Sequence, residues 1–255
     1  MKAPKGSGRP DFERFIEISD LDGKNRTTLK TSPEKNNYGP LWSPDGLSIA
    51  FHTLIRNSTS HEVQWCIGIG KRDLNAVSIL RNPVLDHGYF VFTWTPTGDL
   101  AVLGNDTLNF ISPSGILRRS ARLALDTLGG TEYSPSSADI LCVSPDGRYI
   151  AWIVDGSDEG SKNFEAIHEE DLYGILLVYD QTTHSLQRLS PKTLSVAFEP
   201  PVWLPDQSAL VFSAIEAAKP LREGARPTTD LFRLALNGSS LHRLASHGHC
   251  PAVLR

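Results

Sequence analysis

Histidine, cysteine and carboxylate side chains are the residues of this 255-residue chain that could carry chemistry. Near the C-terminal end, His247, His249 and Cys250 follow one another closely, and these side-chain types bind zinc. The group lacks the wider ligand separation of a structural zinc site, and Cys250 stands just before an expected strand, where a small buried residue fits. We therefore predict no metal and no other cofactor, and keep a divalent cation as the alternative.

The most acidic stretch of the chain runs from Asp158 to Asp171 and includes His168, Glu169 and Glu170. One interpretation is a lip that binds a partner or a cation. The other is a solvated loop, which we favour because runs of charge usually remain in water.

Sequence signatures of a catalytic centre are absent. The chain has no Gly-x-Ser-x-Gly nucleophile motif, no phosphate-binding loop, no dinucleotide-binding glycine pattern and no zinc-protease helix motif. We therefore leave open whether the protein is an enzyme and favour a non-enzymatic role, with an active site assembled from several loops as the alternative.

Composition and charge argue against two classes of partner. The net charge is −4 at pH 7, and the basic cluster from Arg118 to Arg122 has no aromatic residues around it, so nucleic acid is not expected. No apolar run approaches a membrane span, and no apolar stretch follows the basic N-terminus as in a secretory signal. Three cysteines, Cys66, Cys142 and Cys250, do not make a disulfide framework. We expect a soluble, cytoplasmic monomer with free thiols.

Internal repetition organises the rest of the sequence. Four segments share a short turn core followed by an apolar run, and the cores lie at residues 42–46, 94–98, 143–147 and 203–207. The tail at 251–253 resembles the start of a fifth repeat. Successive cores lie about 50 residues apart, the length of one β-propeller blade, and an insertion at about 155–171 accounts for the longest interval.

Each core has the chemistry of a tight turn between two strands. In the first core Ser43 can accept hydrogen bonds, Pro44 presets the second position of a type I turn, and Gly46 closes the fourth. The second core lacks the Asp, and Gln207 replaces the glycine of the fourth, which weakens the turn prediction there.

A second hairpin follows the first in every unit, so each repeat is predicted to hold four antiparallel strands. The expected third strands lie at 15–18, 66–69, 108–111, 175–178 and 231–234. The expected fourth strands lie at 28–29, 77–80, 116–117, 186–189 and 241–244.

The Trp-Ser-Pro-Asp-Gly core followed by Ile-Ala-Phe is similar to the repeat of TolB-type β-propellers. The resemblance covers nearly the whole chain, from residue 12 to 253, and is most specific at 42–51 and 143–152. It implies an all-β fold of four-stranded blades arranged radially. TolB-type propellers commonly have six blades, whereas the repeats counted here predict five.

The two ends of the chain predict how the ring closes. The chain begins with third and fourth strands and ends with a first strand, so both termini would share the closing blade. No second strand for that blade is evident, because Gly6, Gly8 and Pro10 disfavour one near the N-terminus. We predict a flexible segment at 1–11 and a single propeller domain at 12–255, with an open ring or a fragment as alternatives.

In a propeller, the loops that enter the first strand and the loops between the second and third strands share one face. On this assignment the predicted binding face carries histidines and carboxylates from several repeats: His61, His87, Glu132, His168, Glu169, Glu170, Glu199, His247 and His249. No catalytic residue is assigned.

Three functional hypotheses follow from the sequence. The leading one is a TolB-like scaffold that binds a protein partner through this face. The second is a hydrolase or lyase with a His/carboxylate site at the channel mouth, with or without a divalent metal. The third is a propeller fragment of a larger protein, such as a serine peptidase. The fold alone does not decide among them.

Overall fold

The structure is a computed structural model, and it describes residues 14–29, 37–56, 63–72, 77–80, 90–104, 106–128, 134–135, 141–155, 173–197, 199–216 and 228–248. The chain forms two compact units, Met1–Gly88 and Tyr89–Arg255. The predicted N-terminal segment lies outside the described residues, as does the insertion beyond Asp155, and the single domain at 12–255 stays a prediction.

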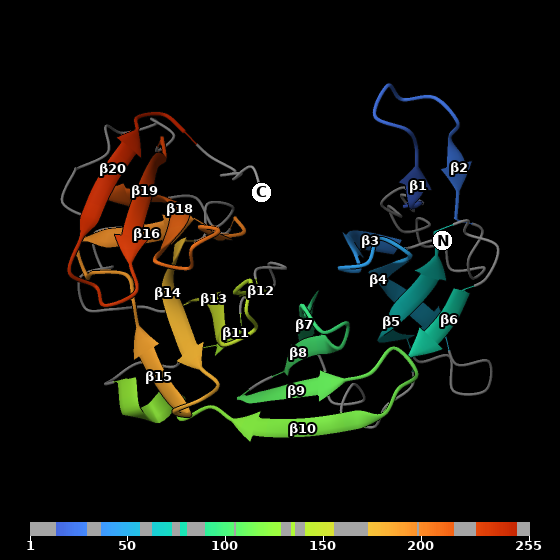
Figure 1. The fold of residues 1–255 in the computed structure, drawn as a ribbon, viewed down its shortest axis with the longest axis horizontal. Helices are drawn as coiled ribbons and strands as arrows, with labels where there is room; N and C mark the ends of the chain where they lie inside the picture. Colours follow the sequence, from blue (N-terminus) through green and yellow to red (C-terminus); the bar gives the residue numbers. More distant parts are fainter. Residues whose placement is uncertain are drawn as a thin grey trace, which may run out of the picture. The chain divides into compact units, whose positions relative to one another are not determined.

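The first unit contains two antiparallel sheets (Figure 1). One is a hairpin of β1 (Glu17–Ile18) and β2 (Thr27–Thr28). The other, which we call repeat A, holds four strands in chain order: β3 (Asn37–Trp42), β4 (Ser48–Arg56), β5 (Val63–Lys71) and β6 (Val77–Leu80). Ile16 and Leu29 of the hairpin segment pack against Ile49 and Phe51 of β4 in a buried cluster.

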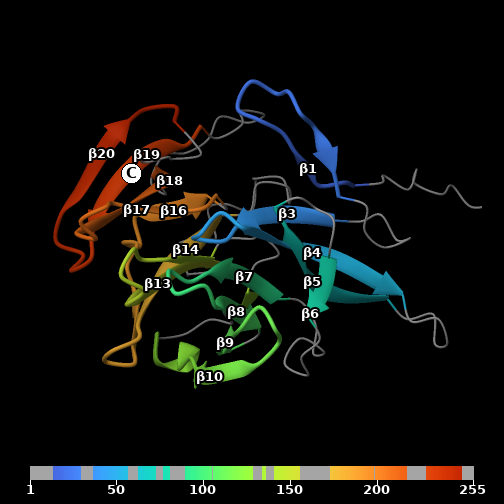
Figure 2. The ribbon, with the colours of Figure 1, turned by 45° about the vertical axis from the view of Figure 1, so that its right-hand side comes forward.

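The second unit begins with repeat B, a four-stranded sheet whose strands lie side by side in chain order (Figure 2). Its strands are β7 (Phe90–Trp94), β8 (Leu100–Gly104), β9 (Thr107–Ile111) and β10 (Leu117–Arg122). A short 3-10 helix, η2 (Leu125–Leu128), follows it.

Two further repeats belong to one ten-stranded sheet. Repeat C holds β12 (Leu141–Val143), β13 (Tyr149–Asp155), β14 (Tyr173–Asp180) and β15 (Ser185–Arg188). Repeat D holds β17 (Val202–Trp203), β18 (Ala209–Glu216), β19 (Asp230–Ala235) and β20 (Leu241–Ala245). The short strand β16 (Leu194–Ala197) pairs with both β14 and β18 and so joins the two repeats, while β11 (Ser134–Pro135) pairs with β13.

The predicted four-stranded repeats are confirmed, because every expected third and fourth strand overlaps an observed strand. Alternation along the second strands explains the packing: Ala151 and Ile153 enter the core shared by repeats C and D, whereas Ile150 and Trp152 enter the core shared by repeats B and C. Each second strand is therefore buried on both faces.

The predicted turns are also confirmed. In repeat C the main-chain nitrogen of Gly147 donates to the carbonyl of Ser144 at 2.8 Å, and Gly147 has a φ of 79°. The Ser144 hydroxyl donates to Asp146 Oδ1 at 2.6 Å and accepts from the Tyr149 nitrogen at 2.8 Å. These bonds fix the serine, aspartate and glycine of the repeat core in one tight hairpin.

The turn of repeat D keeps this geometry although Gln207 stands in place of glycine. Its nitrogen donates to the Leu204 carbonyl at 2.9 Å, and its φ is 60°. With its amide nitrogen turned toward Asp146, Gln207 donates to the two carboxylate oxygens at 2.6 and 2.8 Å. A side chain in the left-handed region is strained, and this bond to the neighbouring repeat offsets the strain.

Among the described residues, no helix is both long enough and apolar enough to span a membrane.

Candidate binding site

In every repeat the second strand ends, and the third strand begins, at one end of the sheet, which we call the 2–3 end. Because neighbouring strands are antiparallel, the fourth strand also ends there. The sequence places the candidate residues at this end, and two of them, Glu199 and His247, lie in the described part of the second unit. Seven lie outside the described residues and stay predictions: His61, His87, Glu132, His168, Glu169, Glu170 and His249.

Glu199 is held at the 2–3 end of repeat D by a buried hydroxyl. The Ser213 hydroxyl donates to Glu199 Oε2 at 2.6 Å, and Ser213 is 1% exposed on β18. The corresponding second-strand positions in repeats B and C are apolar, Leu103 and Ile153. In repeat D, Ser213 therefore occupies this core position with a polar side chain, and its hydroxyl orients the half-buried carboxylate of Glu199.

His247 lies just after β20, and its side chain is exposed. Its main-chain nitrogen donates to Asp230 Oδ1 at 3.1 Å, and its φ is 56°. Asp230 Oδ2 lies 3.1 Å from Nε of Arg243, whose terminal nitrogen pairs with Glu216. Glu199 is thus fixed by β18, whereas His247 is fixed by β19.

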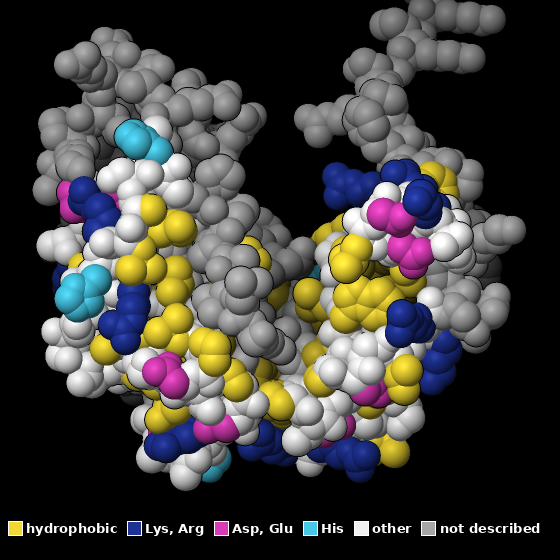
Figure 3. Space-filling model, turned by 45° about the horizontal axis from the view of Figure 1, so that its top comes forward, with side chains coloured by type: hydrophobic (Ala, Val, Ile, Leu, Met, Phe, Trp, Pro, Cys, Tyr) yellow, Lys and Arg dark blue, Asp and Glu magenta, His cyan; other side chains and the backbone are white. Residues whose placement is uncertain are grey.

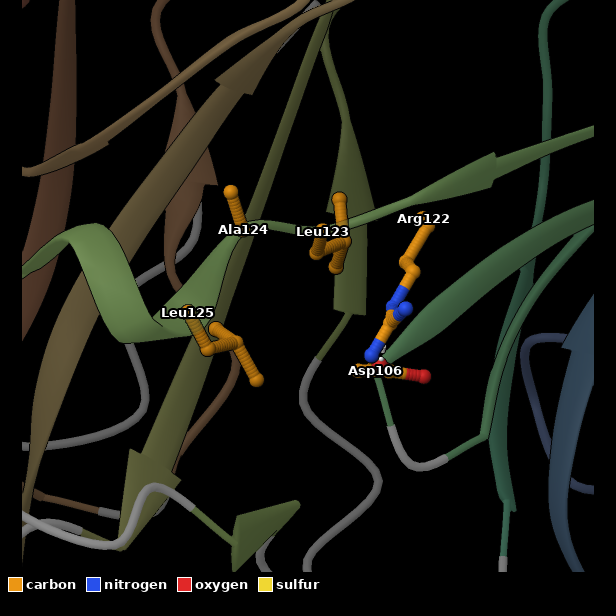
Figure 4. A pocket seen from close by; sticks show the side chains of 5 residues that line it. All are labelled: Asp106, Arg122, Leu123, Ala124 and Leu125. Atoms are coloured by element: carbon orange, nitrogen blue, oxygen red, sulfur yellow. Dashed lines mark hydrogen bonds and ion pairs between the residues drawn. The ribbon is translucent and has the colours of Figure 1, made fainter.

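A second acid–arginine pair lies at the 2–3 end of repeat B, and the sequence analysis predicted neither this pair nor the pair of Asp230 and Arg243. Nε of Arg122, at the end of β10, donates to Asp106 Oδ2 at 2.8 Å, just before β9 begins. The pair lines a pocket of about 450 Å³ together with Leu123, Ala124 and Leu125 (Figure 4). The available signal was an Asp at the start of a third strand with an Arg on the fourth strand, which recurs as Asp230 and Arg243.

Hydrogen bonding sets the charge of Asp106. The Arg122 guanidinium and the Thr107 hydroxyl, which donates to Oδ1 at 3.0 Å, lower the pKa of Asp106 below its ordinary value. Asp106 is therefore a carboxylate at neutral pH and holds its charged partner in place.

Cys142 does not offer a nucleophile. Cys66 and Cys142 form no disulfide, as predicted, and burial raises the pKa of the Cys142 thiol to about 12. Cys142 therefore carries no thiolate at neutral pH.

In the first unit, the 2–3 end of repeat A is aromatic. His52 is 2% exposed and stacks on Tyr38 at 4.8 Å between ring centroids, and Trp65 meets Tyr38 edge-on at 5.2 Å. The Thr53 hydroxyl beside them is buried and has no hydrogen-bond partner among the described residues. These rings pack against one another in repeat A, and we assign no function to them.

Metal ligands do not assemble in the described ranges, where no group of three or more His, Cys, Asp or Glu side chains could hold an ion. His249 and Cys250 of the zinc-like motif lie outside those ranges, so the prediction of no metal stays a prediction. On the face drawn in Figure 3, Lys and Arg side chains lie beside Asp and Glu side chains, in keeping with the ion pairs of the strand ends.

Comparisons with known proteins identify the fold. No family model matches the sequence, and no curated protein matches it. Among solved structures, the tricorn protease matches with a TM-score of 0.55 at 12% identity, over 91% of this chain and 24% of that chain. A mutant puromycin hydrolase matches with a TM-score of 0.54 at 14% identity, over 88% and 32%. The β-propeller domain of the Trilobed protease from Pyrococcus furiosus matches with a TM-score of 0.51 at 13% identity, over 90% and 63%.

These likenesses and the four-stranded antiparallel repeats define the class: the chain has an all-β, β-propeller fold. It spans about a quarter of the tricorn protease chain and about a third of the puromycin hydrolase chain. The five-blade count and the shared closing blade stay predictions.

Proposed function

We propose that the chain is a non-catalytic propeller of the TolB type that binds polypeptide partners through the 2–3 ends of its repeats. One observation carries the proposal: repeats B and D each hold an Asp–Arg pair, Asp106–Arg122 and Asp230–Arg243, at this end. In each pair the aspartate lies at or just before the start of a third strand and the arginine lies on the neighbouring fourth strand, so strand pairing brings the two together. Fixed charges on a rigid scaffold suit recognition of a charged partner.

Two of the propeller neighbours support a polypeptide partner. These two are named as a protease and as a protease domain, and the third neighbour is named as a puromycin hydrolase. This chain has no nucleophile motif of its own, and Cys142 is protonated. Binding without cleavage is therefore the activity that its described residues suit.

A second candidate is the propeller part of a larger peptidase. It is favoured by the share of the neighbours' chains that this sequence spans, 24% and 32%. In that setting the same 2–3 ends would contact substrate chains or a catalytic domain. The hydrolase or lyase hypothesis keeps His87, Glu132, His168, Glu199 and His247 as its candidates, and most of them lie outside the described residues.

A peptide-display selection tests the proposal. The immobilised full chain is panned against a random peptide library, and enriched peptides are measured by fluorescence anisotropy against wild type and the double variant Glu216→Gln/Asp230→Asn. We expect at least about tenfold weaker binding by the variant, the loss of a few charge-assisted contacts. Mass spectrometry of the incubated peptides should show no cleavage.

The matched control is Asp206→Asn, an exposed carboxylate in the turn at the opposite end of repeat D. It should bind the peptides as wild type does. Charge reversal at Glu169 and Glu170 extends the test to the acidic insertion. Failure to enrich any peptide, or equal losses in the double variant and the control, would reject the proposal.

A further inference from the structure

We propose that Arg122 binds a peptide carboxylate in the pocket at the 2–3 end of repeat B. This inference rests on the proposed function and deepens it, since it names the chemical group that one site recognises. The carboxylate can come from a peptide C-terminus or from an acidic side chain.

The pocket has a fixed apolar wall. Leu123 is 3% exposed and belongs to the core of repeats B and C, and Leu125 packs against that core. The Leu123 nitrogen donates to the Asp106 carbonyl at 2.7 Å, which ties the segment after β10 to the start of β9. Figure 4 shows the charged pair on one side of Leu123, with Ala124 and Leu125 on the other.

Arg122 is oriented so that part of its guanidinium is available. Its Nε is bonded to Asp106, and the arginine side chain is 85% exposed. Within the described part of the chain, Asp106 is the one carboxylate paired with Arg122. A guanidinium has five N–H donors in a planar fork, so the terminal amino groups can still receive a second carboxylate.

Repeat D shows that an arginine at the 2–3 end can hold two carboxylates at once. Nε of Arg243 pairs with Asp230, as that of Arg122 pairs with Asp106, and a terminal nitrogen of Arg243 binds Glu216. Ala214 pairs with Asp230 in repeat D and Gly104 pairs with Thr107 in repeat B, so Asp106 stands at the position of Glu216 and Thr107 stands at the position of Asp230. Repeat B thus supplies one carboxylate to its arginine where repeat D supplies two, and an external carboxylate at Arg122 would be the second.

The apolar wall adds a requirement for the ligand. A peptide whose carboxylate reaches the Arg122 fork would bring its neighbouring side chain toward Leu123, Ala124 and Leu125. An apolar side chain next to the carboxylate would bury surface against that wall. The site therefore fits a carboxylate beside an apolar residue.

Three fluorescein-labelled peptides with a glycine-serine body test the inference on the full chain. The first ends in Leu with a free carboxylate, the second is its C-terminal amide, and the third is an amide with Glu beside the Leu. We expect the first or the third to bind at least about tenfold more tightly than the second, as for a charge-assisted bond. Which of the two binds identifies the source of the carboxylate.

Arg122→Ala should reduce the better peptide to the affinity of the plain amide, and raised salt should weaken the wild-type complex. The control is Arg118→Ala, on the same strand, where the arginine lies 3.9 Å from Asp99 and outside the pocket. Equal binding of all three peptides, no binding of any, or an unchanged affinity in Arg122→Ala would overturn the inference. The proposed function would survive if library peptides still bind through repeat D.

Discussion

Carboxylates at both ends of the repeats are held by arginines, and at the residue scale this sets their charge. Asp180, at the end opposite the 2–3 end of repeat C, accepts from Arg148 Nη2 at 2.7 Å and from the Thr182 nitrogen at 2.8 Å. The hydrogen bond from Arg148, followed by those from the Thr182 and Thr183 main-chain nitrogens, lowers the pKa of Asp180 far below its ordinary value. Its side chain is 12% exposed, so the pair is better shielded than Arg122 and Asp106.

Replacing Asp180 by Asn should lower the free energy of unfolding at pH 7 by about 1 kcal/mol, as expected for a charge-assisted bond near the surface. Because the pKa is depressed in the folded state, the unfolded chain takes up the proton first as pH falls. The stabilisation is therefore complete at pH 7 and is lost from about pH 4 downward.

Urea unfolding of wild type and Asp180→Asn at pH 7 and near pH 3 measures this, and the gap between them should shrink at the lower pH. Asp22→Asn is the control, since the Asp22 side chain is 54% exposed beside an exposed lysine, and it should leave the midpoint unchanged. A gap that stays constant with pH would contradict the assignment.

At the element scale, the first strands differ in how their tryptophans are buried. Trp203 of β17 is 7% exposed, stacks on Tyr149 at 5.9 Å, and its Nε1 donates to the Cys142 carbonyl at 3.5 Å. Both partners belong to the preceding repeat C. Trp42, the equivalent residue of repeat A in the first unit, is 47% exposed. The same motif position therefore contributes unequally to the two units.

Trp203→Ala should cost about 3–5 kcal/mol of stability, the range for truncating a buried aromatic side chain. Trp42→Ala should cost less than half as much, because less apolar surface returns to water. Urea unfolding followed by circular dichroism compares the two variants. Equal losses would show that Trp42 is covered in solution and would disprove this expectation.

At the scale of the whole molecule, the β-propeller fold accounts for nearly all of the chain, since three propeller-containing structures with TM-scores of 0.51–0.55 match 88–91% of it. Repeat architectures gain stability as each repeat packs on the next, as repeats B, C and D do through their shared cores. We propose that the chain is a monomer without a resident metal.

Light scattering during gel filtration should give the mass of one chain, and thermal unfolding should show one cooperative transition whose midpoint EDTA leaves unchanged. An ion that binds the native state would raise the midpoint. A rise with one divalent ion would move the metal-dependent enzyme hypothesis ahead. A broad transition or aggregation would indicate that the chain does not fold as a closed propeller.

Local chemistry made the repeats predictable from the sequence. The Ser144–Gly147 turn depends on side chains within four positions of one another. The second strands are apolar on both faces because a neighbouring repeat packs against each face. Gln207 shows the limit of this reasoning, because its turn depends in part on Asp146 of another repeat.

The sequence by itself determined the four-stranded repeat and its turns, whereas the face on which it expects the charged loops stays a prediction. The tertiary structure decided which charged groups meet. Arg122 and Asp106 are 16 positions apart, Ser213 and Glu199 are 14 apart, and Arg243 and Glu216 are 27 apart. These pairs form only when the register of neighbouring strands and their connections is set, and packing of the whole sheet fixes that register.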